Sequence, residues 1–194
     1  MNRSTIIKTV LIAALGSFCT LRPEAESCSN FKVRAGLFIP QSTLFREIYG
    51  SAAPLIQAEV VTSICEHIDF WANIDGIFKH GESIGLCNDT KISMASLSAG
   101  FRFPHQLVCM NSLFYVGVGA SLAGIWLRNA STCCPCEKVS KGSIGIILKS
   151  GISHEVCDCF LIEFFADYNY QPVCFQRHLT VGGGKIGVGF GYSF

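Results

Sequence analysis

The last nine residues of this 194-residue chain constrain its fold more than any other segment. Large apolar residues occupy every second position, and glycine or serine occupies the positions between them. Because alternate residues of a β-strand point to opposite faces, this strand has one bulky apolar face and one face with almost no side chains. A water-soluble barrel or sandwich would direct its bulk inward. The pattern instead predicts a transmembrane strand whose bulky face meets lipid, formed by Ile186, Val188, Phe190, Tyr192 and Phe194.

The N-terminus predicts export of the chain. Arg3 and Lys8 form a short basic region, residues 9–18 form an apolar run, and Ala25 and Ser27 give the small-residue pattern of a cleavage site. A run of about ten residues is too short to span a bilayer as a helix. We therefore expect residues 1–27 to be a cleaved signal peptide and residues 28–194 to form one barrel domain.

The composition favours a membrane protein that crosses the bilayer with strands. Lys and Arg number 15 against 14 Asp and Glu, so nothing indicates a nucleic acid as partner. Charged residues make up only 15% of the chain and the mean hydropathy is +0.40. Outside the signal, however, no uninterrupted apolar stretch has the roughly 18 residues of a spanning helix. A barrel reconciles these facts, because only every second residue of its strands faces lipid.

The alternation predicts an all-β fold, an eight-stranded antiparallel up-and-down transmembrane β-barrel. The expected strands cover roughly residues 31–40, 55–65, 69–80, 91–103, 113–127, 142–154, 160–171 and 185–194. Short connections near 66–68, 104–112 and 155–159 alternate with long ones near 41–54, 81–90, 128–141 and 172–184. Outer-membrane barrels have short periplasmic turns and longer outer loops. An even strand count then brings both termini to the periplasmic side.

The strand positions that face inward carry the charged residues. Five of them are basic and four are acidic, and small residues lie between them. The charged residues are Lys32, Arg34, Glu59, Asp75, Arg102, Lys149, Glu163, Asp167 and Lys185. An eight-stranded barrel is just wide enough for side chains to fill. An isolated buried charge costs several kcal/mol, so these charges must pair or be hydrated. We expect a closed, salt-bridged interior, with a narrow water-filled conduit as the alternative.

The whole mature chain resembles the small eight-stranded outer-membrane proteins, the class of the OmpA transmembrane domain, OmpX and the opacity proteins. The resemblance rests on the strand–loop rhythm and on the terminal Phe194 after alternating aromatics, which is similar to the C-terminal assembly signal of bacterial outer-membrane barrels. This class implies structural, adhesive or envelope-integrity roles and has no common active site.

The cysteines are expected at the two rims of the barrel. Cys28, Cys65, Cys109, Cys157 and Cys159 fall at the short-turn side, and Cys87, Cys133, Cys134, Cys136 and Cys174 fall in the long connections. The rims are a membrane thickness apart, far beyond the Cα separation of about 4.4–6.8 Å that a disulfide allows. Disulfides must therefore form within a rim. Each rim has five cysteines, so internal pairing leaves at least one thiol of each rim unpaired.

We therefore expect disulfides between this chain and other envelope proteins, which resembles the cysteine-rich outer-membrane proteins of chlamydia-type bacteria. One alternative is that all the cysteines pair internally, with Cys28 lost or free. Another is a metal site formed by Cys133, Cys134 and Cys136 with Cys87 or Cys174. Zinc sites, however, prefer C-x₂₋₄-C spacing, and an oxidising compartment favours disulfides.

Signals for catalysis are weak, so we expect no enzyme and no cofactor. Residues 182–187 match G-x-G-x-x-G formally, but no helix follows them as a dinucleotide site requires. A lipid-modifying enzyme would need a lipid-facing Ser–His pair. Ser150 and His154 share the outward face, yet four residues along a strand separate them by about 13 Å.

The expected function is an integral outer-membrane protein with a structural role, whose partners are outer-membrane lipid and other envelope proteins. A narrow porin-like channel, a loop-mediated adhesin and a lipid-modifying enzyme are the alternatives. The sequons at Asn88 and Asn129 leave open a secreted, disulfide-rich β-sandwich. That fold would have polar outer faces, whereas the strands predicted here have apolar outer faces and charged inner ones.

Overall fold

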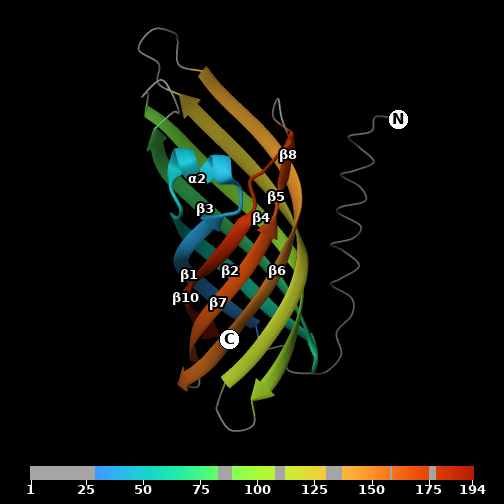
Figure 1. Ribbon diagram of the computed structural model, residues 1–194. Coiled ribbons are helices and arrows are strands. Elements are labelled where there is room, and N and C mark those ends of the chain that lie inside the picture. The colour runs from blue at the N-terminus through green and yellow to red at the C-terminus, as the bar shows by residue number, and fades with distance from the viewer. Residues whose placement is uncertain (1–28, 83–88, 108–111, 130–136, 158, 175–177) are drawn as a thin grey trace, which may run out of the picture.

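The structure is a computed structural model that describes residues 29–82, 89–107, 112–129, 137–157, 159–174 and 178–194. The predicted signal peptide and Cys28, Cys87, Cys109, Cys133, Cys134 and Cys136 lie outside these residues. Eight long antiparallel strands form a closed barrel in the order β1-β10-β7-β6-β5-β4-β3-β2 (Figure 1). The predicted fold class and strand count are confirmed, and the β-sandwich alternative is wrong.

The barrel strands follow the chain in up-and-down order, with a short helix and a small hairpin in two of the connections. The elements are β1 Ser29–Pro40, α2 Thr43–Tyr49, β2 Ala53–Cys65, β3 Ile68–Glu82, β4 Asp89–Leu107, β5 Ser112–Asn129, β6 Glu137–Cys157, β7 Phe160–Tyr170, β8 Pro172–Cys174, β9 His178–Thr180 and β10 Gly183–Ser193. We call the end where β1 begins and β10 ends the short-turn end, and the opposite end, where α2 lies, the long-loop end.

The barrel closes where the first strand pairs with the last. The register of β1 with β10 runs from Asn30 opposite Ser193 to Pro40 opposite Gly183. Beyond it, the backbone N–H of Ser29 donates to the carbonyl of Phe194 (3.0 Å), and the N–H of Phe194 donates back to Ser29 (2.9 Å). Closure gives each of the eight barrel strands a partner on both sides, whereas an open sheet would present an edge of unpaired backbone groups that a bilayer could not hydrate.

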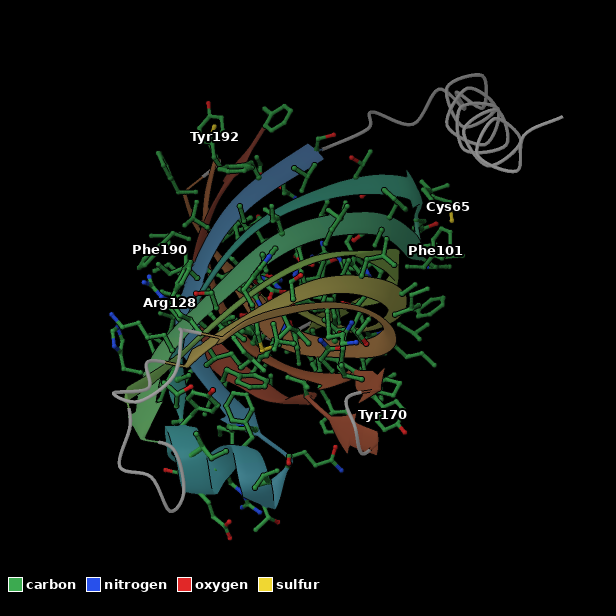
Figure 2. The ribbon with its side chains drawn as sticks, turned by 90° about the horizontal axis from the view of Figure 1, so that it is seen from above. Cys65, Phe101, Arg128, Tyr170, Phe190 and Tyr192 are labelled. Carbon is green, nitrogen blue, oxygen red and sulfur yellow. The ribbon has the colours of Figure 1, made fainter. Side chains whose placement is uncertain are left out.

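The outer face of the wall is apolar around the barrel. Phe190 is 64% exposed, and Ile146 on β6 and Ile74 on β3 are each 57% exposed. Figure 2 shows Phe101, Phe190 and Tyr192 projecting away from the interior. Exposed aromatic and aliphatic side chains on a closed barrel are the pattern of a lipid-facing surface.

The inner face accommodates its large side chains by means of glycines. A Cβ atom added to Gly119 would lie 2.5 Å from Cζ2 of Trp71, whose indole is fully buried. A Cβ added to Gly189 would lie 2.9 Å from Cγ of Arg34 and 3.2 Å from Oε2 of Glu163. The face of the last strand that carries almost no side chains is therefore the crowded one.

The largest departures from the predicted lengths are in three strands. Most strands were expected to have 10 to 13 residues, whereas β4, β5 and β6 have 19, 18 and 21 residues. Their pairing continues through polar residues, as where Thr90 lies opposite Asn129. Apolar alternation marks only the lipid-facing part of a strand, so the polar extensions carried no signal.

The segment 41–54 was predicted only as a long connection, and it contains α2. The side chain of Ser42 accepts a hydrogen bond from the N–H of Phe45 (3.4 Å) at the helix start, and Gly50 ends the helix with φ 84°. The segment 172–184 likewise contains the β8–β9 hairpin. Among the described residues, no helix is long and apolar enough to cross a membrane.

Candidate functional site

The charged side chains that the sequence directs inward all lie inside the barrel. Each is at most 5% exposed: Lys32, Arg34, Glu59, Asp75, Arg102, Lys149, Glu163, Asp167 and Lys185. They come from seven of the eight barrel strands, because the side-chain period of two puts one face of every strand on the same interior.

Arg34 is the centre of this arrangement. Its Nη2 donates to Oε1 of Glu59 (2.6 Å), and its Nε donates to Oε2 of Glu163 (2.6 Å). Nη2 also donates to the hydroxyl of Tyr115 (3.0 Å), and Nη1 lies 3.6 Å from Oδ2 of Asp167. A guanidinium presents five N–H donors in a fixed fork, which allows one arginine to join several acidic groups.

Lysines complete the pairing of the same carboxylates. Lys32 donates to Oε1 of Glu163 (2.7 Å), and Lys149 donates to Oε2 of Glu59 and lies 3.6 Å from Oδ2 of Asp167. Both carboxylate oxygens of Glu59 and both of Glu163 thus contact a cation. Away from this network, Lys185 donates to Oδ2 of Asp75 (2.7 Å).

Asp69 is an interior acid that the sequence analysis missed. It is 3% exposed, and its Oδ2 accepts from Nε of Arg102 at 2.8 Å. Its position, six residues before Asp75 on the same strand, puts it on the inward face, so parity could have identified it. With Asp69 the interior holds five basic and five acidic side chains. We call these ten residues the charged cluster.

Aromatic rings line the cations of the charged cluster. Nζ of Lys149 lies 4.4 Å from the ring centroid of Trp71, and Cζ of Arg102 lies 4.9 Å from that of Tyr115. Such cation–π contacts contribute most where water is excluded. Lys32, Arg34, Arg102 and Lys149 therefore have both carboxylates and aromatic faces as partners, which offsets their loss of hydration.

The long-loop half of the interior holds a large apolar cluster, which the sequence analysis did not predict. We call it the apolar cluster, and its members are Phe38, Phe45, Tyr49, Ala53, Leu55, Ile77, Ile92, Met94, Ile125, Phe165, Val173 and Val181. Phe45 and Tyr49 come from α2 and stack with ring centroids 4.9 Å apart. The helix thus covers this end of the barrel with its apolar side.

Tyr49 ties α2 to the barrel strands. Its hydroxyl lies 3.1 Å from Oγ1 of Thr90 on β4. Burial raises the pKa of the Tyr49 phenol, so the group stays protonated at neutral pH and keeps a proton for this contact. A Cβ added to Gly81 of β3 would contact the Ile48 carbonyl and lie 2.7 Å from the Tyr49 ring. Helix and strand therefore approach closely at this point.

The short-turn end is hollow where the other end is filled. A cavity of about 100 Å³ opens there, lined by Asn30, Lys32, Arg102, Gln106, Ser153 and Leu161 among others. From this end inward the interior consists of a polar vestibule, the charged cluster and the apolar cluster. Beyond the vestibule, charged and apolar side chains thus occupy the described interior.

Two exposed thiols lie at the short-turn rim. Cys65 ends β2 and Cys159 precedes β7, and both are free. Cys157 and Cys174 stand at the ends of β6 and β8, with side chains outside the described set. No group of three or more His, Cys, Asp or Glu side chains among the described residues could hold a metal. The cysteine pairings proposed from sequence remain predictions.

Ser150 and His154, the pair that a lipid-modifying enzyme would need, have other partners. The Ser150 hydroxyl donates to the carbonyl of Ala166 (2.6 Å). Nδ1 of His154 instead lies 3.0 Å from Oγ of Ser112, its cross-strand neighbour on β5. His154 therefore contacts Ser112 because the register of β5 and β6 places these two residues opposite each other.

The alternating residues of the last strand all face outward. Ile186, Val188, Phe190, Tyr192 and Phe194 are between 39% and 70% exposed. This is the placement that the alternation predicts, while a role as an assembly signal remains a prediction.

Comparison with solved structures gives the same fold. Neisserial surface protein A matches with a TM-score of 0.65 at 15% identity over 87% of this chain and 100% of that one. OprG of Pseudomonas aeruginosa matches with a TM-score of 0.65 at 12% identity, covering 89% and 99% of the two chains. Ail of Yersinia pestis, solved with the heparin analogue sucrose octasulfate, matches with a TM-score of 0.60 at 14% identity, covering 88% and 100%.

No protein-family model and no curated protein matches the sequence. At these identities the similarity concerns the fold alone. It confirms the resemblance to small outer-membrane barrels that the strand–loop rhythm indicated.

Proposed function

We propose that this protein is an integral barrel of the bacterial outer membrane with a structural role in the envelope, and that thiols at its short-turn rim join it to other envelope proteins. The observation that carries the structural role is the filled interior. Five cations and five anions neutralise one another in the middle of the barrel, and the apolar cluster fills the half beyond them. Such an interior stabilises the wall and offers no wide path for solutes.

The location follows from the outer surface and from the fold. Each of the eight barrel strands presents apolar residues on its outer face, and the similar solved structures include outer-membrane proteins. In such barrels the short turns face the periplasm. On this basis Cys65 and Cys159 are periplasmic, in a compartment where disulfides form.

Cross-linking is ordinary thiol oxidation. The thiolate of Cys65 or Cys159 attacks a disulfide of an exported oxidant and forms a mixed disulfide with it. A partner thiolate then attacks the Cys65 or Cys159 sulfur of that mixed disulfide, and the oxidant leaves as a thiol. One S–S bond forms between the two proteins, and the oxidant takes up two electrons and two protons. Because both thiols are exposed, a partner reaches them without unfolding of the barrel.

The test is gel mobility of the outer-membrane fraction, boiled and unboiled, with and without reductant. Wild type should show a heat-dependent shift, which reports a folded barrel, and oligomers that reductant removes. Cys65→Ser with Cys159→Ser should keep the shift and lose the oligomers. Ser63→Ala, next to the same rim, is the control that should keep both. Unchanged oligomers in the double variant would disprove cross-linking through these thiols, and a soluble protein would disprove the location.

The porin-like alternative has a separate test. Conductance across planar bilayers should stay at background for wild type, because salt-bridged side chains and the apolar cluster occupy the interior. Stable single-channel openings by the unmodified protein would contradict the structural role and favour the channel.

A further inference from the structure

Three basic residues form a row across the outer wall near the long-loop end. Strand register puts His80 of β3 opposite Lys91 of β4, and Lys91 opposite Arg128 of β5. All three side chains are exposed, and Figure 2 shows Arg128 on the outside of the barrel. Lys138 is the β6 residue opposite Arg128. We call His80, Lys91 and Arg128 the basic row.

Within the part of the chain whose side chains the structure describes, no acidic partner contacts the basic row, whereas every cation of the charged cluster has one. Residues directly opposite on paired strands have Cβ atoms about 4.5–5.5 Å apart, and like charges there destabilise the sheet. The ion pairs among the described residues all lie inside the barrel, and none includes a member of the basic row. A bound anion that bridges the row would remove this repulsion.

The row lies at the level where a membrane surface is expected. Two residues toward the middle of the strands, the outward positions are Phe78 and Trp126, which are 64% and 50% exposed. Aromatic side chains of this kind gather at membrane–water interfaces. Since a strand rises about 3.3 Å per residue, the basic row lies about 7 Å beyond these rings, on the side away from the membrane centre. That is the position of lipid headgroups.

Below the aromatic residues the wall is hollowed. The next outward row has Gly76, Ala95, Gly124 and Gly142 in register across four strands. A depression of about 500 Å³ that is open to the outside lies here, lined by Gly124, Gly142 and the apolar side chains of Leu122 and Ile144 among others, and we call it the hollow. A Cβ added to Gly142 would meet nothing nearer than a carbonyl oxygen at 4.0 Å. The hollow has space and an apolar lining, which suit a hydrocarbon chain.

We propose that this surface binds one phosphorylated lipid of the leaflet at the long-loop end, with phosphate on the basic row and an acyl chain in the hollow. The Arg128 guanidinium offers forked donors that match phosphate oxygens, and Lys91 supplies a second positive charge beside it. Phosphate recognition and acyl-chain space occur on the same strands, β4 to β6, which a soluble anion alone would not require. This inference rests on the outer-membrane location proposed above.

The test measures lipid binding to the purified, folded barrel in detergent by native mass spectrometry. The probes are bisphosphorylated lipid A and the same lipid without phosphates. Wild type should bind the phosphorylated form more tightly, and Lys91→Gln with Arg128→Gln should weaken that binding about tenfold, as expected for losing charge-assisted hydrogen bonds. Arg46→Gln with Lys141→Gln removes two exposed cations outside the row and should leave binding unchanged.

A third variant tests the hollow. Gly142→Leu should weaken binding of phosphorylated lipid A but leave binding of inorganic phosphate unchanged, because only the acyl chain needs the space. A heat-dependent mobility shift confirms that each variant is folded, and the single variants Lys91→Gln and Arg128→Gln replace the double one if it does not fold.

Three results would overturn the proposal. The first is that wild type shows no preference for the phosphorylated lipid, and the second is that the Lys91–Arg128 and Arg46–Lys141 double variants lose lipid binding equally. The third is that the basic row binds sucrose octasulfate while the protein does not bind lipid A. The last would indicate a soluble sulfated glycan as ligand. Because lipid binding is measured on the isolated barrel, a failure of the thiol cross-linking proposal does not affect this test. A chain that shows no heat-dependent mobility shift would instead refute the proposed outer-membrane location.

Discussion

The two halves of the interior are stabilised in different ways. In the charged cluster, the single side chain of Arg34 contacts side chains from three other strands, β2, β5 and β7, so loss of this one group affects much of the wall. In the apolar cluster, the contacts are non-directional, and part of them comes from α2, which is not a barrel strand. The comparison teaches that the charged half holds strands together, while the apolar half fills and covers the long-loop end.

The largest expected effect is the removal of Arg34. Arg34→Ala leaves Glu59 and Glu163 buried with fewer cations and should lower the free energy of unfolding by about 3–5 kcal/mol. Urea unfolding of the barrel in detergent micelles measures this. Lys141→Ala, an exposed cation, is the control and should change stability by less than about 0.5 kcal/mol. Equal effects of the two variants would mean that interior charge pairing does not hold the strands together.

A smaller loss is expected in the apolar cluster. Leu55 is 1% exposed, so Leu55→Ala creates a cavity and should cost about 2–4 kcal/mol in the same unfolding measurement. Ile56, the next residue on β2, is 65% exposed on the outer face. Ile56→Ala makes no internal cavity and should cost clearly less. If Ile56→Ala costs as much as Leu55→Ala, the apolar interior is not closely packed.

Overpacking tests the glycine face next to the charged cluster. Gly189→Ala forces Arg34 or Glu163 to move and should cost about 1–3 kcal/mol. Gly142→Ala adds the same methyl group to the open outer wall and should be neutral within about 0.5 kcal/mol. The unfolding midpoints of the two variants give the comparison, and a neutral Gly189→Ala would show that the inner face has unused space.

The smallest effect is expected at the helix over the apolar half. Ser42→Ala removes the cap of α2 and should destabilise the helix locally by about 0.5–1 kcal/mol, with the barrel unchanged. Amide hydrogen exchange should speed up in residues 43–49 and stay constant in β2. Ser51→Ala, an exposed serine after the helix, is the control. Faster exchange throughout β2 would show that α2 is coupled to the whole wall.

Much of the fold was available from residue order. Alternation identified all eight strands and the inward position of nine charged residues, because in a membrane barrel the face of each residue follows directly from its parity. Asp69 was missed although it obeys the same rule, since it stands at the very start of its predicted strand. The helix α2 was also foreseeable in part, from Ser42 as a cap, Phe45 and Tyr49 four residues apart, and Gly50 as a stop.

The sequence by itself therefore determined which residues face lipid and which face inward, because lipid and interior impose opposite demands on alternate positions of each strand. Only the tertiary structure decided which charges meet, which end of the barrel is filled, and that His80, Lys91 and Arg128 stand side by side. These properties depend on the register between strands and on where a connection folds back. Register is set by hydrogen bonding between segments distant in the chain, and no local pattern records it.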